Sequence, residues 1–300
     1  MVTASALLCA APIGSARASV ISSDLAITAH ANISANTSAI ADATHAAASP
    51  PASGNAAQNA VVTWISGGMS ASASVDSSLA IRGPLPLGGP LLKLGDGVGI
   101  TSTMNGYDDG QPATSDGLFG DYSLTLSNHS ASHAYQVSLQ IDYANSVQAS
   151  GPAAPPDGAF NIGLITLNRG DTALFFTNLT SDTAFGDKHD VLFTGTSGQN
   201  QSDSGVRTVD LTLRPGDTIQ LQGQHDLRGG ASRTGASYRG GLKAFISLAA
   251  VSDLSGGVSA TPAASKPADT GHSSLMRPIV WDLLVLCVIA VLVLLRRRRK

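Results

Sequence analysis

The chain has 300 residues, and its 21 acidic residues, all of them aspartate, outnumber 18 lysines and arginines, for a formal net charge of −3. Between Ser19 and Met276 the balance is −9, from 20 aspartates against 11 lysines and arginines, which argues against nucleic acid as a partner because such binding depends on cations facing phosphates. The only cysteines are Cys9 and Cys287, so residues 19–276 have no thiol or disulfide chemistry.

The first residues resemble an export signal in their pattern. Residues 3–14 are mostly small and apolar, and Ala16-Arg17-Ala18 gives the A-x-A pattern of a signal-peptidase site. We expect a signal peptide over residues 1–18, with Ala18 the last residue removed. Residues 19–59 are rich in Ala, Ser and Thr, with a candidate first strand at Leu25-Ala26-Ile27.

The last residues predict a membrane anchor. Residues 278–295 are almost wholly apolar, with Asp282 the one charge near their start, and four arginines and Lys300 follow. At about 1.5 Å per residue, such a helix covers most of a bilayer core about 30 Å thick. The alternative is a buried core helix with a basic tail. A transmembrane helix over 278–295 and a cytoplasmic tail at 296–300 place the rest at the extracellular face of the cell envelope.

Strands and turns are favoured between these ends, because aspartate, Gly, Ser and Thr are abundant and glutamate is absent. Apolar residues alternate with polar ones from Tyr122 to Ser127 and again from Tyr135 to Tyr143, which predicts two half-buried strands. With turn residues between them, we expect an antiparallel hairpin. We predict an all-β fold, an antiparallel immunoglobulin-like or jelly-roll sandwich over residues 60–251, followed by a flexible tether at 252–277.

Further short strands are predicted along the sandwich, and two segments are predicted not to be strands. Gly83 to Pro90 is expected to be a loop, because it holds three prolines, and Arg214-Pro215-Gly216-Asp217 has the order of a type II turn. The strand candidates are residues 61–65, 69–75, 160–167, 172–176, 191–194, 206–213, 218–221 and 242–248.

Residues Pro267-Ala268-Asp269-Thr270-Gly271 resemble the LPxTG and LAxTG signals of sortase substrates, with Pro267 where those signals have leucine. The resemblance implies a sortase-like transpeptidase as a partner. It also implies cleavage between Thr270 and Gly271, which would leave Thr270 joined to the envelope.

A second resemblance lies in the predicted sandwich. Residues 122–128, 176–187 and 213–217 are similar to segments of exported β-sandwich proteins that carry the PEP-CTERM anchor, although the Pro-Glu-Pro motif is absent. Both resemblances imply a bacterial surface protein, and neither implies a reaction.

Several residues are candidates for a chemical site. His129 and His133 are four residues apart and would need a third ligand to hold zinc. Two groups of aspartates lie in Gly-containing loops and could bind calcium or serve as turn and capping residues, the latter being favoured. They are Asp108, Asp109, Asp116 and Asp121, and then Asp182, Asp187 and Asp190. A binding face would be sought first at Tyr107, Arg228, Arg233 and Arg239.

No G-x-S-x-G motif marks a catalytic serine. No sequence pattern predicts a bound cofactor or a bound metal ion. We therefore expect a non-catalytic, surface-anchored sandwich with a structural, adhesive or extracellular-matrix role. Its partners would be the membrane, through the helix, and an envelope polysaccharide or a surface protein. The alternative is an envelope-anchored carbohydrate-binding module or a secreted hydrolase, which a groove with aromatic residues and converging aspartates would favour.

Overall fold

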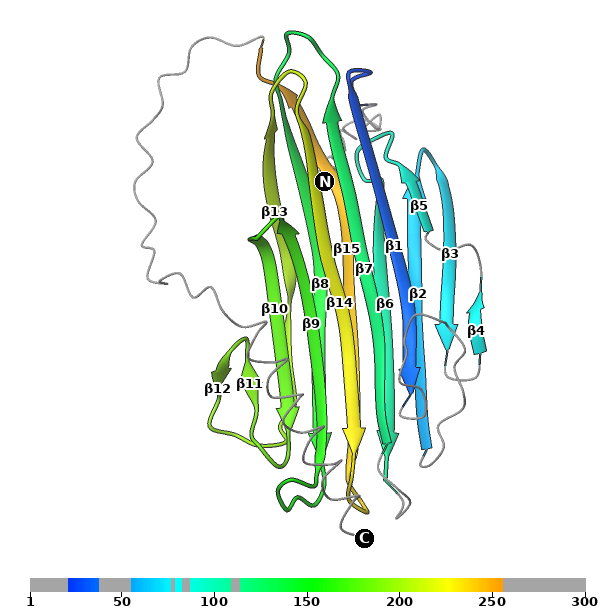
Figure 1. Ribbon diagram of the computed structural model, residues 1–300, viewed down its shortest axis with the longest axis vertical. Helices are drawn as coiled ribbons and strands as arrows, with labels where there is room; N and C mark the ends of the chain where they lie inside the picture. The colour runs from blue at the N-terminus through cyan, green and yellow to red at the C-terminus, as the bar shows by residue number, and fades with distance from the viewer. Residues whose placement is uncertain (1–20, 38–54, 77–78, 83–86, 109–113, 256–300) are drawn as a thin grey trace, which may run out of the picture. The chain divides into compact units, whose positions relative to one another are not determined.

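The computed structural model describes residues 21–37, 55–76, 79–82, 87–108 and 114–255, all within one compact unit that ends at Gly256. These residues form an all-β, antiparallel sandwich (Figure 1). Among them, no helix is long and apolar enough to cross a membrane. The predicted signal peptide with Ala18, the Thr270-Gly271 signal, the helix at 278–295 and the tail at 296–300 lie outside the described residues.

Two sheets make up the sandwich. The eight-stranded sheet has the order β12-β11-β10-β9-β14-β7-β1-β5, and the seven-stranded sheet has the order β13-β8-β15-β6-β2-β3-β4. The strands of the first sheet are β1 (Leu25–Thr37), β5 (Leu87–Pro90), β7 (Thr114–Asn128), β9 (Ala159–Arg169), β10 (Thr172–Asp182), β11 (Lys188–His189), β12 (Leu192–Phe193) and β14 (Thr218–Ala231). Those of the second are β2 (Asn55–Ser66), β3 (Met69–Asp76), β4 (Leu79–Arg82), β6 (Gly97–Tyr107), β8 (Tyr135–Ser150), β13 (Gln201–Leu213) and β15 (Ser237–Asp253).

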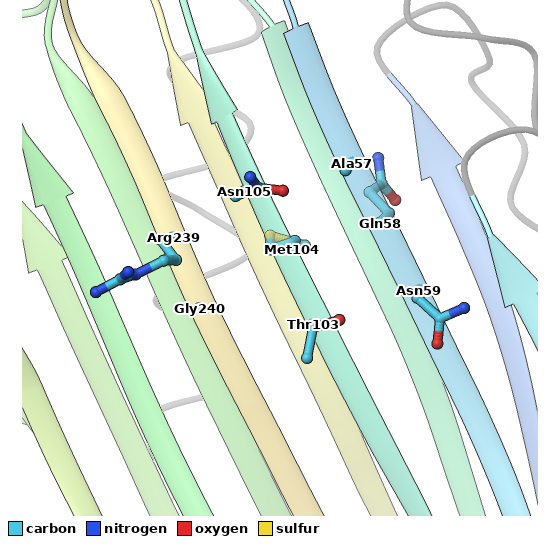
Figure 2. Close-up of a pocket in the computed structure, with 8 residues that line it drawn as sticks. All are labelled: Ala57, Gln58, Asn59, Thr103, Met104, Asn105, Arg239 and Gly240. Carbon is cyan, nitrogen blue, oxygen red and sulfur yellow. The ribbon is translucent and has the colours of Figure 1, made fainter.

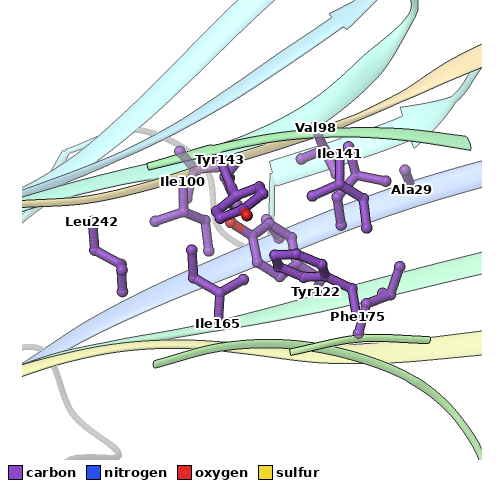
Figure 3. Close-up of a cluster of buried hydrophobic side chains, with 14 of the residues drawn as sticks. Ala29, Val98, Ile100, Tyr122, Ile141, Tyr143, Ile165, Phe175 and Leu242 are labelled. Atoms are coloured by element: carbon purple, nitrogen blue, oxygen red, sulfur yellow. Dashed lines mark hydrogen bonds between the residues drawn. The ribbon is translucent and has the colours of Figure 1, made fainter. Parts of the chain in front are cut away.

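The alternation in the sequence produces the core. Along β8 the buried residues alternate with partly exposed ones from Tyr135 almost to Ser150, which confirms the predicted strand and extends it. Side chains from both sheets meet between the layers, among them Ile100 and Tyr143 from one sheet and Tyr122 and Ile165 from the other (Figure 3). Burying such apolar surface is the main favourable term in folding.

The predicted hairpin of residues 121–143 is wrong. β7 pairs with β1 and β14, whereas β8 pairs with β13 and β15, so the turn after Asn128 carries the chain from one sheet to the other. The buried Asn128 holds this crossing, because its side-chain amide donates to the carbonyls of His133, Leu213 and Arg214. Strands of both sheets bury one apolar face in the core, so alternation predicts a half-buried strand but not which of the two sheets it belongs to.

Other boundaries also differ from the predictions. Leu87–Pro90, predicted as part of a loop, is the edge strand β5 paired with β1, a position where proline costs no ladder bond on its outer side. The sandwich includes β1, so its described part begins before residue 60. β15 continues to Asp253, so the sandwich includes residues 252 and 253, the first two residues of the predicted tether. The Arg214–Asp217 turn is confirmed, with Gly216 at a φ of 79° and the Asp217 amide donating to the Arg214 carbonyl.

Besides the bond from Asn128 to Leu213, further hydrogen bonds join the two sheets. The Tyr122 hydroxyl on β7 donates to the Ala244 carbonyl on β15 at 3.2 Å. The Asn145 amide on β8 donates to the Gly163 carbonyl on β9 at 2.8 Å, and the Ala149 N–H donates to the Ser181 hydroxyl oxygen on β10 at 2.9 Å. These bonds fix how one layer sits on the other, which apolar contact alone specifies less tightly.

We expect Tyr122→Phe to lower the free energy of unfolding by about 1–3 kcal/mol, because the variant leaves the buried Ala244 carbonyl without this donor. Urea denaturation measures the change. Ser138→Ala is the control, since it removes an exposed hydroxyl bonded to Asp210 and should cost less than about 1 kcal/mol. Equal losses in the two variants would contradict a special role for the inter-sheet bond.

Candidate functional site

The outward face of the seven-stranded sheet is polar around its centre. Along β6 the exposed residues are Thr101, Thr103, Asn105 and Tyr107, and they alternate with buried residues that face the core. The strand on one side, β2, adds Asn59 to this face, and the strand on the other, β15, adds Arg239. The face therefore carries hydroxyl, amide and guanidinium groups side by side.

A hollow of about 310 Å³ lies on this face over β2, β6 and β15 (Figure 2). Strand register sets its walls: Asn105 pairs with Ala57 and Arg239, and Thr103 pairs with Asn59. The row between these two, Gln58, Met104 and Gly240, also lines the hollow. Because Gln58 and Met104 turn their side chains into the core, we infer that this middle row contributes mainly backbone, as the floor.

Two of the four residues singled out for a binding face meet here. Arg239 lines the hollow, and Tyr107 stands two residues beyond Asn105 on the same face of β6, with 43% of its surface exposed. Arg228 lies on β14 in the other sheet, and Arg233 lies in the turn between β14 and β15. The sequence did not predict Asn59, Thr103 or Asn105 as site residues, because only the register of β2, β6 and β15 brings them together.

The aspartates at 182–190 organise their loop. The fully buried Asp187 carboxylate accepts hydrogen bonds from the backbone N–H groups of Asp182, Gly198 and Gln199 and from the Thr196 hydroxyl, at 2.8–3.0 Å. Burial would raise the pKa of Asp187, but these donors outweigh it and hold the pKa below its ordinary value. Asp182 and Asp190 likewise accept backbone N–H groups. These hydrogen bonds agree with the favoured prediction that the aspartates of this loop serve as turn and capping residues.

The other aspartate group is dispersed. Asp108 is buried at the end of β6, Asp109 and the side chain of Asp116 lie outside the described residues, and Asp121 is on the outward face of β7. The histidines do not form a ligand pair: His133 Nδ1 lies 2.8 Å from the Asp253 carboxylate, and His129 is exposed in the turn. Among the described residues, no group of three or more histidine, cysteine or acidic side chains is placed to hold a metal ion.

Asp121 has a charged neighbour that the sequence did not indicate. Asp226 on β14 is nearly buried and pairs with Arg228, whose Nη2 donates to its Oδ2 at 2.9 Å. Burial raises the pKa of Asp226 and also that of Asp121, and the negative charge of Asp121 adds to the effect at Asp226. Arg228 also lies over the Phe119 ring, 5.1 Å from its centroid, so its contacts explain it as a structural residue.

An apolar patch, missed in the sequence, lies at one edge of the eight-stranded sheet. We call Phe176, Phe185, Val191, Leu192 and Phe193 the β10–β12 patch; all five side chains are exposed. Leu192 and Phe193, at 69% and 66% exposed, form β12, the outermost strand of that sheet. Val191-Leu192-Phe193 is an apolar run without alternation, and such a run is equally typical of a buried strand, so the sequence alone does not predict an exposed patch.

His225 is fully buried in the core, with Nδ1 3.2 Å from the Tyr122 hydroxyl and Nε2 without a hydrogen-bond partner. Burial lowers its pKa to about 3, so it is neutral near pH 7. Enclosed in this way, the imidazole is a structural group that substrate cannot reach.

No protein-family model matches this chain, and no curated protein matches it. Among solved structures, it is similar to the VP2 subviral particle of infectious bursal disease virus, at 10% identity over 76% of this chain and 65% of that chain, with a TM-score of 0.14. A structure of the Gx strain of infectious bursal disease virus is similar at 12% identity over 76% and 68% of the two chains, with a TM-score of 0.12. The chain spans about two thirds of the length of these chains, and TM-scores this low carry no argument about fold or function.

Proposed function

We propose that this chain is an exported, surface-anchored sandwich of the immunoglobulin-like or jelly-roll kind, with an adhesive or extracellular-matrix role and no catalytic one, and that it works by self-association. The β10–β12 patch carries the proposal. Anchoring at the extracellular face is supported by the apolar run 278–295 and the cations after it, with cleavage at Thr270 by a sortase-like transpeptidase as a further step.

The patch is unusual for the outer surface of a monomer. Five large apolar side chains from β10, the following turn and the β11–β12 hairpin are exposed. Leu192 and Phe193 are successive residues of β12, so they face opposite sides of the sheet at its edge. Single exposed apolar residues need no explanation, but five near one sheet edge favour an interaction surface. A partner that covers it would gain roughly 1.5–3 kcal/mol for each side chain that becomes fully buried.

A second copy of the chain is the partner that fits. β12 ends the eight-stranded sheet, so its outer backbone edge can accept another strand, and its two side chains are the most exposed of the patch. Two β12 strands paired antiparallel about a two-fold axis would satisfy both edges and bring both patches together. The nearby charges, Lys188 and Asp190, have opposite signs, so two copies would not repel each other there.

The patch lies away from the point where the chain leaves the sandwich. β15 ends at Asp253 beside Tyr135, the first residue of β8, whereas the end of β10 is bonded to β8 at Ala149, near its other end. Figure 1 shows the β11–β12 hairpin at the lower left and the end of β15 at the top. The described chain therefore ends at the end of the sandwich away from the β11–β12 hairpin.

We expect lipid vesicles that carry the full chain to cluster, and Phe193→Asp to abolish the clustering. The carboxylate removes the apolar ring and must lose its water on association, even with Lys188 beside it, whose Nζ lies 4.7 Å from the native ring centroid. Light scattering measures cluster size. Val206→Asp is the matched control, since Val206 is an exposed apolar residue (57%) on β13, the edge strand of the other sheet. Clustering by the Phe193→Asp chain, or its loss in the Val206→Asp chain alone, would refute self-association through β12.

A further inference from the structure

We propose that the hollow over β2, β6 and β15 binds a saccharide unit that carries a carboxylate, as uronic acids do. This site goes beyond self-association, since it lies on the seven-stranded sheet while the β10–β12 patch lies on the eight-stranded one. The hollow has a suitable size, its side chains have suitable chemistry, and one arginine is placed to meet a carboxylate.

The size of the hollow suits one small unit of a longer ligand. Its volume of about 310 Å³ is at the lower end of the range for ligand sites, roughly 300–1,000 Å³. Because the exposed Asn59, Thr103, Asn105 and Arg239 line it, we infer that it opens on the outward face of the sheet. The walls stand on long paired strands, which hold them more rigidly than loops would.

The side chains around the hollow match a polyol. Asn59 and Asn105 each offer an amide N–H₂ donor and a carbonyl acceptor, and Thr103 adds a hydroxyl that can do either. Sugar hydroxyl groups also donate and accept, so neighbouring hydroxyls on a ring can be satisfied in pairs by an amide. Tyr107, on the same face beyond Asn105, presents a partly exposed aromatic ring against which the apolar face of a sugar ring can pack.

Arg239 indicates the acid. Among the described residues that line the hollow, Arg239 is the one that is charged. Its Nη2 donates to the Gln148 amide oxygen at 3.3 Å, which steadies the guanidinium without neutralising it. Among the described residues, the side-chain ion pairs are His133–Asp253, Arg228–Asp226 and Lys243–Asp142, so Arg239 keeps its charge for a ligand. A planar guanidinium pairs bidentately with a carboxylate better than with a lone hydroxyl.

Other ligand classes fit this surface less well. A nucleic acid would need a row of cations, whereas Arg239 is the single cation among the lining residues that the structure describes. A peptide bound by its side chains would leave the hydrogen-bonding groups of Asn59, Thr103, Asn105 and Arg239 without matching partners. A carboxylated saccharide uses the arginine, the amides and the tyrosine together.

The test uses the full chain in detergent micelles and two probes, a trimer of galacturonic acid and the uncharged trimer of galactose. Isothermal titration measures both affinities. We expect the acidic trimer to bind at least tenfold more tightly than the neutral one, with a preference that weakens as salt is added. Arg239→Gln should reduce the preference to about twofold or less, and Asn105→Ala should weaken binding of both trimers several-fold.

Lys243→Gln is the matched control. It removes one positive charge from the same face of β15, four residues or about 13 Å from Arg239, and should leave both affinities unchanged. No binding of the acidic trimer, equal binding of both trimers, or equal losses in the two charge variants would overturn the proposal. Vesicles carrying the Arg239→Gln chain should still cluster, so a failure of this site is distinguishable from a failure of self-association.

Discussion

Replacing Asp187 with alanine is expected to lower the free energy of unfolding by about 3–5 kcal/mol. The carboxylate is fully buried and accepts three backbone N–H groups and one hydroxyl, so its loss leaves several buried donors unsatisfied. Its pKa is held below the ordinary value, so its stabilising effect is present at neutral pH and is lost as the pH falls through that lowered pKa.

The same variant should also abolish self-association. Asp187 ties the end of β10 to the segment 196–199, and the β11–β12 hairpin lies between these points. Without the carboxylate we expect the hairpin to lose its fixed position, and vesicles carrying the variant not to cluster. Asp187→Asn keeps the shape and one oxygen acceptor, and should lie between the native chain and the alanine variant in stability.

Urea denaturation of the full chain in micelles provides the measurement for Asp187, and Asp217→Ala is the control. Asp217 accepts one backbone N–H, from Arg214, in an exposed turn, so its replacement should cost about 1 kcal/mol or less. An Asp187→Ala variant as stable as the Asp217→Ala variant would contradict the role given to the buried carboxylate.

His225 should make the sandwich sensitive to acid. In the native chain burial lowers its pKa from 6.5 to about 3, so below pH 6.5 the unfolded chain takes up a proton that the folded chain does not. The stability due to this neutral imidazole is therefore complete above pH 6.5 and falls toward pH 3, by up to about 1.4 kcal/mol per pH unit. The pKa of Asp187 is lowered by its hydrogen-bond donors, so its contribution to stability is also lost as the pH falls, in the same direction as that of His225.

Comparing His225→Leu with the native chain isolates this effect. The leucine variant cannot bind the proton, so its stability should fall less steeply between pH 6.5 and pH 4, although its absolute stability at pH 7 will differ because the Tyr122 hydroxyl loses a neighbour. His129→Gln, at an exposed turn position, should keep the native slope. Equal slopes in the native and His225→Leu chains would show that the buried imidazole is protonated as easily as a free one.

The strands were predictable where side chains alternate, as in β7 and β8, because a half-buried strand has a period of two. β6 was not predicted, because Gly97 and Gly99 interrupt its pattern. A Cβ at Gly97 would clash with the Ile246 backbone, and one at Gly99 with the Ala244 and Phe245 backbone, so close approach to β15 requires both glycines. Such a requirement is visible only once the partner strand is known.

For the candidate sites, too, residue types could be predicted from the sequence but their spatial arrangement could not. Tyr107 and Arg239 could be singled out as residue types suited to binding, but their shared face depends on the register of β6 and β15. The role of Asp187 depends on donors from residues 182 and 196–199, which a loop sequence does not specify. His225 looked like any other histidine, because its burial comes from packing across both sheets.

The most direct test of the proposed role is the sedimentation of intact cells that produce the full chain, with and without brief trypsin treatment. Surface display and self-association through β12 predict that the cells clump and settle quickly, that trypsin disperses them, and that Phe193→Asp cells stay dispersed. Cells that settle at the same rate with either chain, and whose sandwich resists trypsin until they are lysed, would contradict the account.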